Sequence, residues 1–126
     1  MTERSPDDRR RAVQRGAQAE SWVARRLESE GWRILERNWR CDAGEIDLVA
    51  EREGVLRFVE VKARVPEDPT GLEAVDREKQ RRVARAAETF LAVREGNWRE
   101  VAFLVALVEP TPSGFAAQWV DDAFDA

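Results

Sequence analysis

Charged side chains of catalytic types interrupt an otherwise apolar stretch of this sequence. Residues 44–64, GEIDLVAEREGVLRFVEVKAR, place Asp47 in the first half and Glu60 and Lys62 in the second. An exposed cross-strand ion pair would explain such charges, because every second residue of a half-buried strand faces water. The same residue types also suit metal-assisted hydrolysis, in which carboxylates bind the metal and a lysine acts beside it.

The register of the hairpin that this stretch predicts decides whether the charges meet. If residues 53–54 form the turn, counting outward places Asp47 opposite Glu60. The next facing pair on that side would be Glu45 and Lys62, so all four side chains would share one face. A three-residue loop would instead shift the pairing by one and separate the acids onto opposite faces.

Lysine and histidine usage narrows the chemistry that this chain can perform. Of the 21 basic residues only Lys62 and Lys79 are lysines, and lysine, unlike arginine, can be tuned to release a proton. The chain has no histidine and one cysteine, Cys41, so an internal disulfide is excluded and a zinc site is not expected. Any catalysis must therefore use carboxylates, lysine or a hard metal.

A long N-terminal helix is expected to carry a further carboxylate, Glu20, in its apolar face. Ser5 and Pro6 predict the start of this helix, which should run to about Glu30 and stop at Gly31. Its inward stripe comprises Val13, Ala17, Glu20, Ala24 and Leu27. Glu20 therefore needs a partner, a metal or a raised pKa, unless the helix rotates enough for it to reach solvent.

The remaining patterns predict the elements that must position these residues. A weakly alternating strand is expected at 32–40, a strand buried on both faces at 101–108 and a final alternating strand at 114–120. A proline-rich loop at 65–71 precedes a second helix, expected from Asp76 to about residue 94. The order helix, three strands, helix, two strands indicates an α/β fold with a mixed central sheet flanked by helices.

The second helix repeats the pattern of the first, with a charged residue inside its apolar stripe. Lys79 interrupts that stripe much as Glu20 interrupts the first one. The inward residues of the stripe are Val75, Val83, Ala86, Ala87, Phe90 and Leu91.

Two or three carboxylates that converge without histidine or thiolate form a hard oxygen site. Glu20, Asp47 and Glu60 would suit Mg²⁺ or Mn²⁺, which keeps several waters and accepts phosphate oxygens. Lys62 would lie on the same strand face as Glu60, where it could orient a water or neutralise charge on a phosphate.

Net charge and hydropathy limit the possible partners. The formal net charge of −4 argues against a general polyanion binder, although basic residues cluster at 9–15 and 77–85. Either cluster could be a solvated helix face or a nucleic-acid contact. No apolar run is long enough to span a bilayer and the N-terminus is charged, so we expect a cytoplasmic protein without membrane contact.

Several motifs together resemble a known family. The segments NWR, GEIDLVA, FVEVKAR and AVDREKQRRVARAAETFL are similar to those of the YraN family of small bacterial proteins, and more broadly to the PD-(D/E)XK nucleases. The similarity extends from about Gly16 to Phe124. It implies a restriction-endonuclease-like core, hence one nuclease-like domain over 1–126, with 1–10 flexible and 121–126 an acidic tail.

The resemblance also implies a role for each matching residue. Asp47 and Glu60 correspond to metal ligands, Lys62 to the catalytic lysine, and Glu20 to the glutamate of the first helix that completes many such sites. Further matches are expected to contact substrate phosphates: Lys79, Gln80, Arg40 and Arg64. Glu45 matches the glutamate of the GEID motif, to which no role is assigned.

The chain departs from the family pattern in two places. Ala19 precedes Glu20 where many members have glycine, which leaves the carboxylate in place. Residues 98–101 read WREV where the family often has Arg-Phe-Asp-Val, so Glu100 stands in for the aspartate while the Arg-Phe pair is lost.

The expected function is Mg²⁺- or Mn²⁺-dependent endonucleolytic hydrolysis of DNA, with structured or branched DNA as the favoured substrate and a homodimer as a possible assembly. One alternative is a nucleic-acid- or protein-binding module on a nuclease-like fold, with an idle acidic cluster. A metal-dependent enzyme acting on another phosphate ester is a further alternative.

Overall fold

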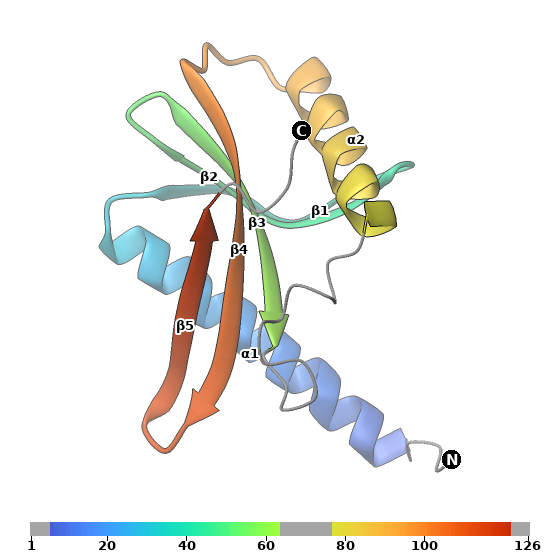
Figure 1. Ribbon diagram of the computed structural model, residues 1–126, viewed down its shortest axis with the longest axis vertical. Coiled ribbons are helices and arrows are strands. Elements are labelled where there is room, and N and C mark those ends of the chain that lie inside the picture. Colours follow the sequence, from blue (N-terminus) through green and yellow to red (C-terminus); the bar gives the residue numbers. More distant parts are fainter. Residues whose placement is uncertain (1–5, 64–76, 122–126) are drawn as a thin grey trace.

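The computed structural model describes residues 6–63 and 77–121, and the side chains of α1 are described for Pro6 and from Gly16 onward. The elements follow the predicted order of helix, three strands, helix and two strands, which confirms the α/β class (Figure 1). Their bounds are α1 Pro6–Ser29, β1 Arg33–Cys41, β2 Gly44–Arg52, β3 Val55–Ala63, α2 Arg77–Val93, β4 Glu100–Thr111 and β5 Gly114–Asp121.

The five strands form one mixed sheet in the order β1-β2-β3-β4-β5. Only β3 and β4 run parallel, and the chain passes between them through α2, as a parallel connection requires. The other three pairs are antiparallel. Figure 1 shows the two helices on opposite faces of this strongly twisted sheet.

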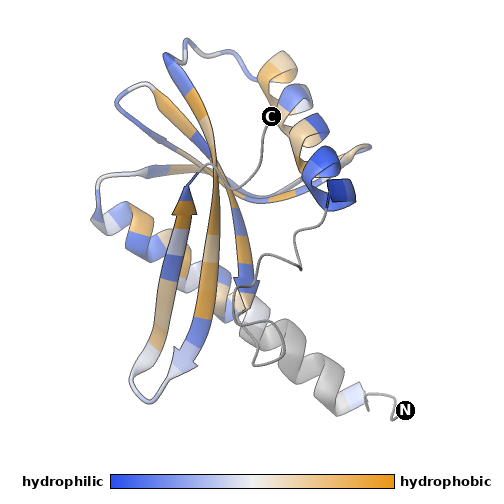
Figure 2. Cartoon of the chain, viewed as in Figure 1, coloured by the Kyte–Doolittle hydropathy of each residue, from blue (hydrophilic) through white to orange (hydrophobic). Residues whose placement is uncertain are grey.

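The sheet separates two apolar layers. Beneath α2, Phe90 meets Phe58 and Trp39 edge to face, with ring centroids 5.6 and 5.4 Å apart. On the α1 side, Val23 and Leu27 pack against the other face of the sheet. Residues 103–108 of β4 are all buried and alternate between the two layers, as predicted for an uninterrupted apolar strand (Figure 2).

The turn between β2 and β3 has the predicted two residues. Arg52 pairs with Val55, and the residues between them, Glu53 and Gly54, have φ angles of 51° and 81°. Positive φ at both central positions is typical of the type I′ turn, whose twist matches that of paired strands. The register that places Asp47 and Glu60 on one face is therefore the one that forms.

The inward stripe of α1 differs from the prediction. Ala17 is exposed and Glu20 lies half-buried at the edge, while Ala19 and Val23 enter the core beside Leu27. The helix is rotated so that the larger Val23 is buried instead of the small Ala17, because a larger apolar side chain gains more from burial. The end of α1 at Ser29, shortly before Gly31, agrees with the prediction.

In α2, Leu91 is also more exposed than predicted, at 37%, because it lies beside the inward row that ends at Phe90. The other described members of the predicted inward stripe are buried: Val83, Ala86, Ala87 and Phe90.

Several predictions lie outside the described residues. These are the Ser5 and Asp76 helix caps, the loop at 65–71, the inward position of Val75 and the contact from Arg64. The side chain of Val13 is likewise not described, nor are the ends of the chain, 1–5 and 122–126. Neither helix, within the residues that are described, is long and apolar enough to cross a membrane.

Candidate active site

The site lies where the sheet divides. Pairing between β2 and β3 ends at Leu48 and Val59, whereas β3 remains paired with β4 as far as Ala63. At the first position beyond this divergence, Asp47 Oδ2 accepts a hydrogen bond of 2.8 Å from the Val61 backbone N–H. The Asp47 carboxylate thus satisfies a backbone donor that has lost its ladder partner.

Glu60 is the only charged side chain that is buried among the described residues, with 3% of its surface exposed. Its Oε2 lies 3.0 Å from the Nζ of Lys79, in the first turn of α2. Burial, followed by the charge of Asp47, raises the pKa of Glu60 to about 7, although Lys79 acts in the opposite direction. Burial also raises the pKa of Asp47.

The two lysines beside Glu60 have opposite pKa shifts. Burial and the neighbouring charge of Lys79 lower the pKa of Lys62, which lies two residues after Glu60 on the same face of β3. Burial acts in the same direction on Lys79, but the charge of Glu60 and hydrogen bonds to Glu60 and Lys62 raise the pKa of Lys79 overall. Lys79 is therefore a fixed cation, whereas Lys62 exchanges its proton more easily.

Asn38 connects the helix carboxylate to this site. With its amide oriented so that the nitrogen faces the acids, Asn38 donates to Glu20 Oε2 at 3.1 Å and to Glu45 Oε1 at 3.0 Å. Asn38 has a φ of 51°, unusual in the middle of a strand and most easily tolerated by glycine or asparagine. Burial, then the charge of Asp47, raises the pKa of Glu20, so the two carboxylates interact.

A pocket of about 260 Å³ opens between these residues and α2. Gly44 forms part of its wall, and a Cβ at that position would lie 3.6 Å from the Cβ of Arg82. The lining residues are Gly44, Glu45, Asp47, Glu60, Lys79, Arg82 and Val83. The pocket therefore exposes acidic oxygens on one side and basic side chains on the other.

The predicted residues are placed as follows. Asp47, Glu60, Lys62 and Lys79 come together, but the predicted pairing of Glu45 with Lys62 is wrong. Because β2 leaves β3 beyond Leu48, Glu45 instead pairs with β1, where its Oε2 lies 3.5 Å from Arg40 Nε.

The other predicted contacts lie around the pocket. Arg40 is largely exposed, and Gln80 is half-buried on α2 and does not line the pocket. Within residues 6–63 and 77–121, no three acidic or cysteine side chains are grouped closely enough to form a preformed metal cage.

Two residues of the site, Asn38 and Arg82, are not identified by the sequence reasoning. Arg82 belongs to a basic cluster that the sequence alone does not orient. A polar residue tolerant of positive φ inside a predicted strand is the one available signal for Asn38.

Fold and site define a small α/β protein whose buried carboxylate and lysines lie at the point where a mixed sheet divides. The chain belongs to the family described as "Uncharacterised protein family UPF0102", whose model matches residues 19–108. This is the family, also called YraN, that the sequence motifs predict.

Similar proteins from several bacteria carry the same family name. A UPF0102 protein of Gloeobacter violaceus is 52% identical over 100 residues, covering 77% of this chain and 79% of that protein. One from Methylococcus capsulatus is 41% identical over 112 residues, covering 88% and 90% of the two chains. One from Myxococcus xanthus is 36% identical over 129 residues, covering 100% and 98%.

Proposed function

We propose that this protein is a divalent-metal-dependent endonuclease that hydrolyses DNA phosphodiesters, with structured or branched DNA as the favoured substrate. The observation that supports the proposal best is the grouping of buried Glu60 with Asp47 and Lys62 at the divergence of β2 and β3. The resemblance of these motifs to the PD-(D/E)XK nucleases supports the same chemistry.

The donor set fits a hard divalent cation. Asp47 and Glu60 would hold Mg²⁺ or Mn²⁺, and Glu20 of α1, which does not line the pocket, would join them only when a cation is bound. Carboxylate oxygens are preferred ligands of both ions, and a cation would offset the cost of ionising two neighbouring buried acids. When bound, such an ion polarises a phosphoryl oxygen and lowers the pKa of water.

The two lysines are suited to different roles in the reaction. Lys62, with a lowered pKa, can accept a proton from an attacking water or donate one to a leaving oxygen. Lys79 keeps its charge and supplies a fixed positive group for a phosphate oxygen. A pocket of about 260 Å³ suits a phosphodiester group and leaves little room for base reading, so shape and backbone should dominate recognition.

A cleavage assay tests this proposal. End-labelled single-stranded, duplex, flapped and four-way DNA is incubated with Mg²⁺, Mn²⁺ or EDTA and with wild type, Lys62→Ala or Glu60→Gln. We expect metal-dependent cuts by wild type and a loss of at least about 100-fold in both variants. Lys62→Ala removes a general acid–base group, which contributes roughly 10²–10⁴-fold, and Glu60→Gln removes one of the two carboxylates that would hold the metal.

The matched control is Glu28→Gln, which removes an exposed carboxylate near the C-terminal end of α1, on the opposite face of the sheet from the pocket, and should cut normally. Circular dichroism confirms that each variant is folded. Cuts that persist in EDTA, or that are unchanged in Glu60→Gln, would contradict the proposal.

The Lys79–Glu60 ion pair favours a second candidate, a DNA- or protein-binding module with an idle site. An internal cation already neutralises the buried acid in that arrangement. If this candidate is correct, the protein binds DNA in a salt-dependent way, or binds another protein, and cleaves no substrate.

A further inference from the structure

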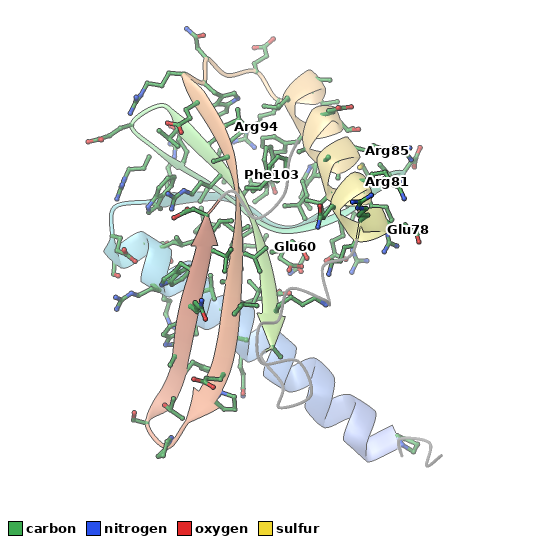
Figure 3. The ribbon with its side chains drawn as sticks, viewed as in Figure 1. Glu60, Glu78, Arg81, Arg85, Arg94 and Phe103 are labelled. Atoms are coloured by element: carbon green, nitrogen blue, oxygen red, sulfur yellow. The ribbon has the colours of Figure 1, made fainter. Side chains whose placement is uncertain are left out.

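The outer face of α2 presents a stripe of exposed arginines. Arg77, Arg81 and Arg85 follow one another at intervals of four residues, so they lie on one side of the helix. The buried residues of α2 occupy the opposite side and face the sheet. Figure 3 shows Arg81 and Arg85 on the side of α2 that points away from Glu60.

These arginines differ from those of the sheet in having no partner among the described residues. In the part of the chain that the structure describes, every arginine of the sheet and of the loops beside it contacts a carboxylate, a hydroxyl or a backbone carbonyl. Arg94, for example, lies 3.2 Å from Glu36. No such contact is formed by Arg77, Arg81 or Arg85 with any described residue, nor by their neighbour Arg82.

The acids on α2 leave this charge unbalanced. Glu78 and Glu88 are exposed and form no ion pair with the arginines of the described helix, although spacings of three and four residues would permit one. The helix carries five basic and two acidic residues in a chain whose formal net charge is −4. Figure 2 shows its first turns as strongly hydrophilic.

The stripe is continuous with the pocket. Arg82 lines the pocket and lies three residues before Arg85 and next to Arg81, so basic side chains extend from the pocket to the outer face. At 1.5 Å per residue, the arginines of the stripe are about 6 Å apart and together span about 12 Å. One strand of DNA presents a phosphate about every 3.4 Å along the axis, so the stripe matches the length of three or four nucleotides.

We infer that the outer face of α2, formed by Arg77, Arg81 and Arg85, binds the phosphate backbone of nucleic acid and leads it through Arg82 to the pocket. The substrate is then a polynucleotide and not a small phosphate ester. The assignment of the pocket as the reaction centre rests on the proposed function, whereas backbone binding by α2 does not.

Salt-dependent binding tests this surface in EDTA, where cleavage is absent. Fluorescence anisotropy measures the affinity of wild type and of Arg81→Ala/Arg85→Ala for a labelled duplex between 50 and 200 mM salt. The slope of log K against log salt should become shallower by about 0.9 for each phosphate contact removed, and by about 0.7 on single strands. Alanine keeps helix propensity, so the fold should persist.

Arg25→Ala is the matched control, because Arg25 is an exposed arginine of α1, on the opposite face of the sheet, with no ion pair to a described residue. Its affinity and salt slope should equal those of wild type. An unchanged slope in the double variant, an equal loss in Arg25→Ala, or no DNA binding by wild type would overturn the inference. Stronger binding to labelled poly-glutamate than to DNA would also overturn it, in favour of an acidic protein partner.

The outcomes separate this surface from the proposed function. If the protein binds DNA through α2 but never cuts it, the inferred binding surface stands and the proposed nuclease function is refuted. If the protein cuts DNA and the double variant binds DNA as well as wild type does, the proposed nuclease function stands and the inferred binding surface is refuted.

Discussion

At the scale of single residues, Asn38 combines an unusual backbone with two charged partners. Its positive φ is unfavourable for most side chains, and its amide contacts Glu20 and Glu45. Strained backbone that is retained next to a group of acids is typical of functional sites. Asn38 is therefore a positioning residue, which holds the carboxylate of α1 close to the strands of the site.

Comparison of Asn38→Gly with Asn38→Ala separates the contribution of the backbone conformation from that of the side-chain hydrogen bonds. Alanine in this backbone conformation costs about 1–2 kcal/mol, whereas glycine adopts it freely, so Asn38→Ala should lose more stability in urea unfolding. Both variants remove a hydrogen bond that lowers the pKa of Glu20, so that pKa should rise further, as measured by NMR titration of the carboxylate.

Asn97→Ala, in an exposed loop, is the control for the loss of an asparagine. An unchanged pKa of Glu20 in Asn38→Gly would show that the amide contact does not hold in solution.

The strand residues of the site could be predicted because side-chain alternation fixes the faces of Asp47, Glu60 and Lys62. The ion pair between Glu60 and Lys79 could not, because it depends on how α2 crosses the sheet. Glu45 was misplaced for the same reason: counting assumes that strands stay paired, and β2 and β3 separate after Leu48.

At the scale of elements, α2 contributes part of the site and depends on a few aromatic contacts for its place. Phe90 is 1% exposed and packs edge to face against Phe58 and Trp39, near the opposite end of the helix from Lys79. The side chain that anchors the helix is thus distant in sequence from the side chain that acts in the pocket.

Truncation of Phe90 should destabilise the protein much more than truncation of its neighbour Leu91. Phe90→Ala should lose about 3–5 kcal/mol of unfolding free energy, because it leaves a cavity among the aromatic rings. Leu91→Ala, at a position that is 37% exposed, should lose less than about 1 kcal/mol. Urea unfolding measures both, and losses of similar size would contradict the observed packing.

Most elements could be predicted because their patterns are local. The apolar run of β4 and the stop of α1 at Gly31 need no tertiary information. The rotation of α1 could not be predicted, because Ala17 and Ala19 are equally compatible with an apolar face and only the fit of Val23 against the sheet selects between them.

At the scale of the whole molecule, the absence of histidine simplifies the response to pH. Ordinary carboxylates are ionised above about pH 5 and lysines stay protonated below about pH 9. The groups that change charge near neutrality are therefore those that the fold has shifted. Glu60, with a pKa raised to about 7, is the clearest of them, and Asp47 and Glu20 are shifted in the same direction.

The free energy of unfolding should fall as the pH rises from about 5 to 7.5 in EDTA. Up to the folded pKa of about 7 the folded protein keeps most of the Glu60 proton, which the unfolded chain, with a pKa near 4.5, has released. The fall should approach about 1.4 kcal/mol per pH unit below pH 7 and level off above it, or about 2 kcal/mol in all. In urea unfolding, Glu60→Gln should lose this dependence and be the more stable protein at pH 7.5, whereas Glu28→Gln should keep it. If Glu60→Gln were instead less stable than wild type at pH 7.5, the ion pair with Lys79 would contribute more to stability than burial of the Glu60 carboxylate costs. The main role of Glu60 would then be structural and not catalytic.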